Sequence, residues 1–421
     1  MTDLAQSAPP LAPSADHLPS RTTFRSLARA TDRRFLALGM AVRLPTAMLP
    51  LGILLYVAET TGSFASGGLA VAALSIGGGL GGPLVGTAAD RFGQRPVVLL
   101  ATLVQVLGIG AFLLAGPLGL PGLSMALAAV IGMANPQGGA MARTRWAALA
   151  RGRRDRLSFT ATAMAYEGAV DESSFVVGPV LVSTVAGLVS PTAGLLLALA
   201  LAAVGQTGFA LHPSSLPGRG AAGTRATADV HRDRAPLQLA HVGFLLLAMA
   251  AIGLVFGASQ TGVAARMADA GTEGLTGPVY ALMGVGSAVA GLLTTRLPRD
   301  FGLASRIAVG GALLVVGGVL VAAAGPAYLL APALLFLGLA LAPALVSAYA
   351  LAERAAPAGW GTTMMTALAT ANVVGVAAGA AVAGLLVDRV SPAAALLVVS
   401  VAGVLVLVGG LGARARPHGV A

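Results

Sequence analysis

The sequence of 421 residues has no cysteine and no lysine, and only 10% of its residues are charged. Without cysteine there is no disulfide framework, no thiolate metal site and no cysteine nucleophile. Without lysine there is no phosphate-binding loop of the form G-x-x-x-x-G-K-[ST], which excludes the usual ATP-driven engine. Soluble chains carry about 25% charged residues, so a water-exposed globule is not expected.

Signals for chemistry are also scarce. The five histidines are dispersed in tails, loops or a span edge, without metal-ligand spacing, and no serine lies in a G-x-S-x-G elbow. The glycines from Gly77 to Gly82 satisfy G-x-G-x-x-G, but no acidic residue follows at the ribose distance. Helix packing explains them better than a dinucleotide. We therefore expect no catalytic residues, no cofactor and no metal.

Apolar residues make up 56% of the chain, and its mean hydropathy is +0.85. A helix needs about 20 mostly apolar residues to cross a bilayer, and the runs lack the alternation of a membrane β-barrel. The prediction is an all-α membrane protein with twelve transmembrane helices. The expected spans are 35–58, 66–89, 96–116, 119–142, 158–188, 192–211, 239–262, 275–295, 304–324, 327–350, 359–387 and 391–412.

The arginines predict the orientation of these spans. Nearly all of the 26 basic residues fall at one end of the predicted helices; only Arg266 and Arg389 fall at the other, and Arg43 lies inside the first span. Positive residues stay on the cytoplasmic side, so we expect a multi-pass protein with both termini cytoplasmic. Arginines scattered between apolar runs also argue against nucleic acid as a partner.

Polar segments divide the chain. Residues 1–34, with four prolines and a basic end, are expected to be a disordered cytoplasmic tail. Residues 212–238 mix proline, glycine and charge, which is typical of a flexible linker. The linker separates two six-helix bundles, residues 35–211 and 239–412, and residues 413–421 form a second cytoplasmic tail.

The two halves contain similar segments. VVGPVLVSTVAGLVSP aligns with VVGVAAGAAVAGLLVD, which places Gly178 over Gly375 and Gly187 over Gly384. Each segment lies on the fifth span of its half and leads to a Ser-Pro pair before the sixth. A chance match is the alternative in so Gly/Ala/Val-rich a sequence, but the shared spacing favours duplication into two pseudo-symmetric bundles. Parallel repeats of this kind are a transporter architecture.

The loop after the second span, GTAADRFGQRP, carries a recognisable pattern. It resembles the signature G-x-x-x-D-R-x-G-[RK]-[RK] that the major facilitator superfamily has between its second and third helices. Gln94 stands where a basic residue is usual. The matching positions are Gly86, Asp90, Arg91, Gly93 and Arg95. The resemblance implies a monomeric twelve-helix secondary transporter, here in a bacterial inner (plasma) membrane.

Partial matches point to the drug-efflux branch of that superfamily. The antiporter pattern R-x-x-Q-G keeps Gln137 and Gly138 but has Ala134 in place of arginine. The resemblance implies an antiporter, with proton-coupled efflux of small organic molecules by alternating access; lipid, substrate and protons are the expected partners. The alternatives are a uniporter or importer of a small metabolite, or a membrane receptor or scaffold that transports nothing.

Asp90 is the residue of the signature loop with the clearest physical demand. Its charge lies at the C-terminal end of a helix, where the helix dipole is unfavourable for an anion. It needs a cation or the N-terminus of another helix, and in this architecture the eleventh helix begins on the same face. We expect the signature residues to form a conformational latch between the halves; the alternative is that they only set topology.

Three carboxylates occupy the fifth span. Glu167 and Asp171 share one helical face, Glu172 is turned about 100° away, and Arg43 lies at similar depth in the first span. A charge in mid-membrane costs about 2.5–3.5 kcal/mol on insertion scales, so these groups should pair, hydrate or take up protons. Three interpretations stay open: a buried network that only ties helices together, a proton-coupling site, and recognition of a cationic substrate.

Few other polar residues interrupt the spans. With so few charges and aromatics, the cavity is expected to suit an amphipathic or apolar solute. In the superfamily, the first, fourth, seventh and tenth helices usually line the cavity, and the resemblance implies that polar residues on them contact substrate; interhelical hydrogen bonding is the alternative. The substrate-contact candidates are Asn135, Gln137, Gln260 and Tyr349. Residues that bend membrane helices are candidate hinges, or else packing kinks. They are Pro45, Pro136, Gly178 and Pro179.

Overall fold

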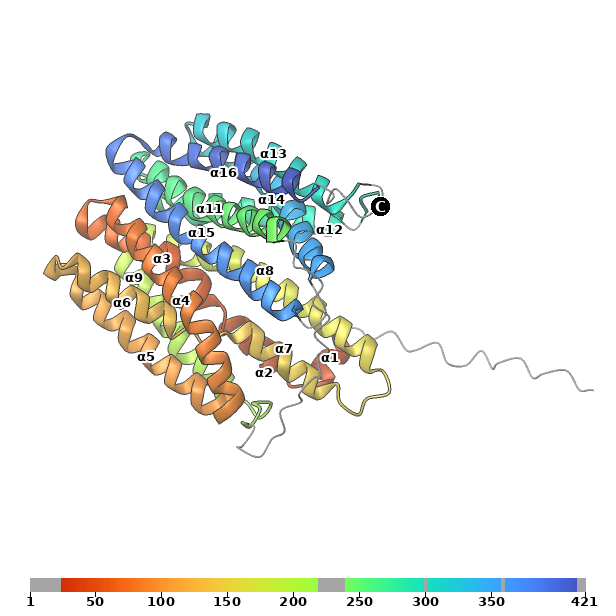
Figure 1. The fold of residues 1–421 in the computed structure, drawn as a ribbon. Helices are drawn as coiled ribbons and strands as arrows, with labels where there is room; N and C mark the ends of the chain where they lie inside the picture. Colours follow the sequence, from red (N-terminus) through yellow and green to blue (C-terminus); the bar gives the residue numbers. More distant parts are fainter. Residues whose placement is uncertain (1–23, 219–238, 295, 299–300, 357–359, 415–421) are drawn as a thin grey trace, which may run out of the picture.

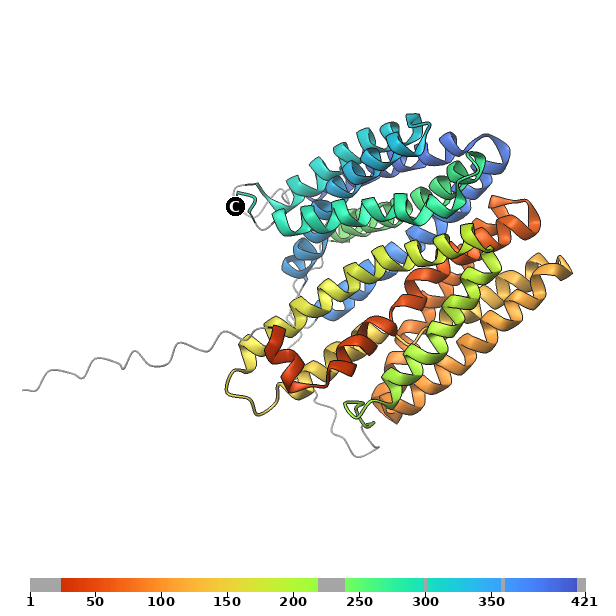
Figure 2. The same ribbon diagram turned by 180° about the vertical axis from the view of Figure 1, so that it is seen from behind.

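The structure, a computed structural model, describes residues 24–218, 239–294, 296–298, 301–356 and 360–414. Within these ranges the chain is helical and has no β-strand. The long helices run side by side in two groups, one for each half of the sequence (Figures 1 and 2).

The first half begins with two short helices. The sequence did not predict the helix at residues 24–30, and most of the helix at residues 33–41 falls within the expected first span, 35–58. The α-helices of the first half are α1 (Phe24–Ala30), α2 (Arg33–Ala41), α3 (Leu44–Thr61), α4 (Phe64–Phe92), α5 (Gln94–Ala115), α6 (Pro121–Met133), α7 (Gly138–Leu149), α8 (Arg156–Leu188), α9 (Pro191–Leu201) and α10 (Thr207–Leu211). A 3-10 turn (Gly116–Leu118) follows α5, and a π turn (Ala202–Gln206) joins α9 to α10.

The second half is more regular, because each predicted span is one helix. Its α-helices are α11 (Leu239–Asp269), α12 (Thr276–Thr294), α13 (Leu303–Ala323), α14 (Ala327–Ala355), α15 (Gly361–Arg389) and α16 (Pro392–Gly412). A 3-10 turn (Glu273–Leu275) precedes α12.

Two predicted spans are interrupted. The first, expected as residues 35–58, is divided at Val42 and Arg43, because α2 ends at Ala41 and α3 begins at Leu44. The fourth, expected as residues 119–142, is not continuous: α6 ends at Met133 and α7 begins at Gly138. Pro136 lacks the amide hydrogen that a helix needs, and Gln137 adopts a left-handed φ of 50°. Eleven helices in the described ranges are therefore long and apolar enough to span a membrane; with α6 and α7 as a broken twelfth, the predicted fold of two six-helix bundles is confirmed.

The predicted tail and linker differ from the structure at their edges. Residues 24–30 and 33–41 are helical, so the expectation of disorder is wrong for the end of the segment 1–34. Leu27 and Phe35 are fully buried. The burial of these apolar side chains explains why the two short helices are ordered. Residues 212–218 pack against the loop that joins α4 to α5; residues 1–23, 219–238 and 415–421 lie outside the described part.

The repeat in the sequence corresponds to equivalent packing. A Cβ added at Gly178 or Gly375 would overlap the first long helix of the same half, at Ala47 and Ala250 respectively. Both Ser-Pro pairs begin a helix in the same way: each serine side chain accepts a hydrogen bond from the amide three residues later, at 3.2 Å. The duplication inferred from spacing is thus visible in three dimensions.

The two halves touch mainly at the end that carries few arginines, called here the arginine-poor end. Gly187 lies against Gly274 of the second half, and Gly384 lies against Phe64 of the first. Toward the opposite, arginine-rich end, where α4 ends and α5 begins, the two groups of helices diverge (Figures 1 and 2).

Candidate functional site

A buried charge cluster lies in the first half, between α3, α7 and α8. The Arg43 side chain donates from Nε to Asp171 Oδ1 at 2.5 Å and from Nη2 to Glu167. Arg143 donates to the second oxygen of Asp171. Trp146, which is fully buried, donates from Nε1 to the second oxygen of Glu167 at 2.6 Å. Two cations thus neutralise two carboxylates, as the cost of isolated charge in an apolar interior requires.

Helix interruptions and one glycine position these groups. Arg43 follows the end of α2 and immediately precedes α3, so its Nη1 reaches back to the Gly39 carbonyl oxygen at 2.6 Å. The break before α7 starts a new helix at Gly138. A Cβ at Gly139 would lie 3.2 Å from both Arg43 Nη2 and Asp171 Oδ1, so the small residue leaves room for the ion pair.

The four charged groups differ in access to the surroundings. The side chains of Arg43 and Glu167 are 7% and 1% exposed, whereas those of Asp171 and Arg143 are 31% and 39% exposed. Asp171 is therefore the more accessible of the two carboxylates in the cluster. Glu172, predicted as a member, is exposed and makes no hydrogen bond or ion pair with any described residue; the helical twist turns it away.

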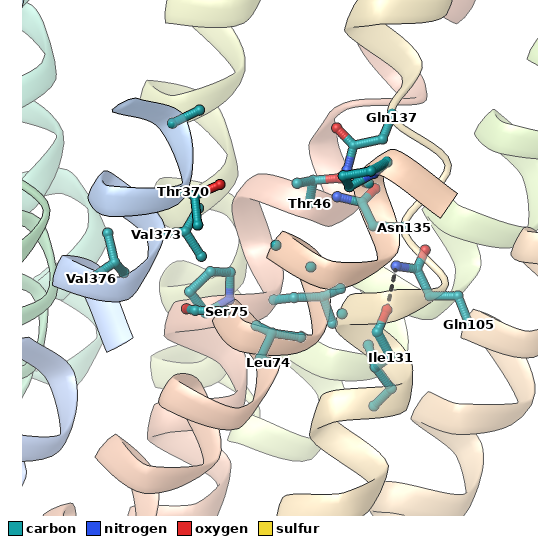
Figure 3. A pocket seen from close by; sticks show the side chains of 18 of the residues that line it. Thr46, Leu74, Ser75, Gln105, Ile131, Asn135, Gln137, Thr370, Val373 and Val376 are labelled. Carbon is teal, nitrogen blue, oxygen red and sulfur yellow. Dashed lines mark hydrogen bonds between the residues drawn. The ribbon is translucent and has the colours of Figure 1, made fainter. Parts of the chain in front are cut away.

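A cavity of about 450 Å³ lies between the two halves. Thr46 and Asn135 border it from the first half, and Thr370 and Val373 of α15 border it from the second (Figure 3). No charged side chain is among its lining residues. Its polar side chains are hydroxyls and amides: Thr46, Ser75, Gln105, Asn135, Gln137, Thr366 and Thr370.

A smaller cavity of about 290 Å³ adjoins the charge cluster. It is bordered by Arg43, Arg143 and Asp171, and it shares Asn135 and Gln137 with the larger cavity. Asn135 also accepts a hydrogen bond from Thr46 Oγ1 at 2.9 Å. The broken fourth span thus lies between an uncharged cavity and a charged one.

The comparisons with known proteins agree on the fold. The sequence model of the Major Facilitator Superfamily matches residues 35–380. The chain belongs to the Major Facilitator Superfamily. No curated protein sequence matches the chain significantly.

Solved structures of other superfamily transporters have a similar fold. The nucleoside transporter NupG superimposes with a TM-score of 0.69 at 13% identity, over 91% of this chain and 99% of that one. A bacterial homologue of the iron transporter ferroportin, in its inward-facing state, gives 0.66 at 16% identity, over 91% and 99%. The POT family transporter PepTSo gives 0.68 at 12%, over 90% and 97%. Membership makes this chain a membrane-embedded transporter of small molecules.

The superfamily signature loop turns at a glycine with a left-handed backbone. Gly93 has a φ of +95°, a region that favours glycine, and Gly86 lies on α4 with open space around it. Asp90 is exposed on the last turn of α4 and forms no hydrogen bond or ion pair with a described residue. Arg91 lies over the Phe92 ring, 5.1 Å from its centroid, and Arg95 is exposed.

Gln94, which departs from the signature, has a specific role in this transporter. Its Oε1 accepts from Arg145 Nε at 2.7 Å, and its Nε2 donates to Thr144 Oγ1 at 2.9 Å. The backbone amide of Gln94 donates a third hydrogen bond, to the Leu216 carbonyl oxygen at 3.0 Å. Only a side chain that both accepts and donates can make the bonds to Arg145 and Thr144. The side-chain amide of Gln94 therefore ties the loop to α7.

Other predicted site residues lie elsewhere. Gln260 on α11 is 9% exposed and Tyr349 on α14 packs against the core of the second half; neither borders the two cavities described. Pro45 is the second residue of α3 and Pro136 lies in the break before α7, whereas α8 runs unbroken through Gly178 and Pro179. Their roles as hinges stay predictions.

Sequence reasoning missed Trp146 and the α15 hydroxyls Thr366 and Thr370. Trp146 lies on the same face of α7 as Arg143, three residues away, but nothing in the sequence pairs it with Glu167. The two threonines follow the periodicity of one helix face and look like ordinary interior residues of a membrane helix.

Proposed function

We propose that this chain is a secondary active transporter of alternating-access type that couples export of an uncharged or amphipathic small organic molecule to proton entry. The observation that supports it most directly is the joint border of the two cavities. Asn135 and Gln137 contact both the uncharged space between the halves and the space beside Asp171. Substrate and proton therefore act on the same broken span.

The proton step follows from the charge balance of the cluster. A proton that binds Asp171 removes one negative charge and weakens the ion pairs to both Arg43 and Arg143. The cluster then carries a net positive charge that is costly to keep in an apolar surrounding. A movement of α7 relative to α3 and α8 lowers this electrostatic cost. Because Asn135 and Gln137, which precede α7, line the larger cavity, the movement changes its walls.

The chemistry of the larger cavity indicates the substrate class. Hydroxyl and amide side chains offer neutral donors and acceptors, while the apolar lining, including Leu74, Ile131 and Val376, excludes a free ion. The likeness to a nucleoside transporter and a peptide transporter, at 14% and 15% identity, concerns the fold alone. The direction of export rests on the partial antiporter pattern at Gln137 and Gly138.

A vesicle experiment tests this function. Purified protein in liposomes is offered a panel of neutral and amphipathic compounds, with and without an imposed pH gradient. We expect a gradient to drive accumulation, Asp171→Asn and Glu167→Gln to abolish that drive, and Glu172→Gln, the matched control one residue away, to retain it. Gradient-driven flux that survives both cluster substitutions would leave the cluster with a structural role only and overturn proton coupling through it.

A further inference from the structure

Asp388, on the last turn of α15, accepts three hydrogen bonds from the beginning of α4 in the other half. Its Oδ2 accepts from Ser63 Oγ at 2.6 Å and from the Ala65 amide at 3.0 Å, and its Oδ1 accepts from the Phe64 amide at 2.9 Å. The first amides of a helix lack intrahelical acceptors and carry partial positive charge. The carboxylate therefore caps α4 from the opposite half.

This contact breaks the symmetry of the repeat. Gly187 and Gly384 are equivalent, yet α8 ends one residue after Gly187 while α15 continues for five residues after Gly384. The additional turn of α15 carries Asp388. At the related interface, the contact is a single hydrogen bond from the Gly277 amide to Ser183 Oγ at 2.8 Å. The charged cap thus belongs to the α4–α15 interface.

The cap forms only when the two halves touch at the arginine-poor end. Close backbone approaches at Gly68 with Ala380 and at Gly384 with Phe64 bring α15 to the start of α4. A rocking motion that opens this end separates those backbones and breaks all three bonds. Ser63 would keep its own cap on α4, since its Oγ also accepts from the Ser66 amide at 3.0 Å, so opening need not unwind the helix.

We propose that Asp388 is a lock that holds the arginine-poor end of this transporter closed. The α4–α15 pair then has a carboxylate near the C-terminal end of each helix: Asp90 on α4 at one end of the molecule and Asp388 on α15 at the other. In the structure Asp388 is bonded across the halves and Asp90 is not. Substitution of Asp388 shifts the conformational equilibrium toward the form open at the arginine-poor end.

The absence of cysteine makes a direct test convenient. Spin labels at Leu118→Cys and Tyr328→Cys, exposed positions on opposite halves at this end, would report the distance across it in lipid nanodiscs. We expect Asp388→Asn to raise the ratio of long to short distances about fivefold, which corresponds to roughly 1 kcal/mol, an ordinary value for a helix cap. Asp388→Glu keeps the charge and should give a smaller rise.

Glu59→Gln is the matched control, because it removes an exposed carboxylate of the first half near the same end, outside the cap. It should leave the distance distribution unchanged. The inference rests on alternating access, so transport is measured on the same variants. A distribution that stays the same in both Asp388 variants overturns the lock, and continued transport by them would show that alternating access itself stands.

Discussion

The indole of Trp146 donates a hydrogen bond of 2.6 Å to Glu167, on the opposite side of the carboxylate from Arg43. Both side chains are almost completely buried, so the carboxylate has one charged and one neutral partner in an apolar interior. This pair links the charge cluster to the aromatic packing of Trp146 with Phe35 and Phe159. It also offers a way to observe the cluster.

Trp146→Phe should destabilise the protein by about 1–3 kcal/mol, because it leaves a buried carboxylate oxygen without a donor. The measurement is thermal unfolding in detergent, with the folded fraction at each temperature determined by fluorescence-detected size-exclusion chromatography. Trp360→Phe, at a residue 49% exposed, is the control and should change stability little. It also leaves Trp146 as the single tryptophan, whose emission should differ between the native cluster and Glu167→Gln. Equal melting temperatures for the two tryptophan variants would contradict the role assigned to the indole.

Gly139→Ala should reduce proton-driven transport at least tenfold while the protein still folds. The added Cβ lies 3.2–3.3 Å from atoms of Arg43 and Asp171, so the ion pair has to shift. Overpacking of this kind costs about 1–3 kcal/mol. Gly168→Ala, next to Glu167 on α8 with open space around it, should transport normally. If the two variants behave alike, the tight fit at Gly139 has no functional consequence.

His212 should make stability depend on pH. It lies just past α10, beside Ser214 and the Phe35 ring. Partial burial, and then the positive charge of Arg145, lower its pKa below the ordinary value of 6.5, although Asp32 acts in the opposite sense. The folded protein therefore disfavours the protonated ring, and this residue's contribution is complete above about pH 6.5 and is lost as the pH falls toward its lowered pKa.

The measurement for His212 is the difference in melting temperature between the native chain and His212→Gln, from pH 7.5 to 5. Carboxylates titrate in both proteins, so the difference isolates the histidine. We expect the native protein to lose relative stability on acidification. A difference that stays constant over this range would show that the ring titrates equally in the folded and unfolded states.

Asp90→Asn should act in the sense opposite to Asp388→Asn. If Asp90 binds the N-terminus of α15 when the arginine-rich end closes, its loss disfavours that state and lowers the ratio of long to short distances across the arginine-poor end by about fivefold. Glu353→Gln is a suitable comparison. Glu353 is likewise exposed near the C-terminal end of a membrane helix, α14, and it lies at the arginine-rich end, as Asp90 does. An unchanged ratio in Asp90→Asn would argue that this carboxylate only sets topology.

Much of the charge cluster could be anticipated, since Arg43, Glu167 and Asp171 are expensive in lipid and share depth and helical faces. Glu172 was predicted as part of the cluster but is exposed. The sequence gives the angle between neighbouring side chains on a helix, but it does not give which face of the helix meets a partner. Gln260 and Tyr349 were chosen by analogy with the superfamily; neither borders the two cavities described, and their contact with substrate stays a prediction. The proline at position 136 signalled a possible break in the fourth span. The apolar content of residues 119–142 nevertheless favoured one continuous helix.

The sequence by itself determined the membrane class, the number of spans and the repeat, because these follow from the run length of apolar residues and from spacing along one chain. Only the tertiary structure decided the partners. Asp388 lies 324 residues from Phe64 along the chain, and Trp146 meets Glu167 only because α7 restarts beside α8. Contacts of this kind depend on how rigid helices pack, which is set by glycine positions and helix ends acting together and not by any local pattern.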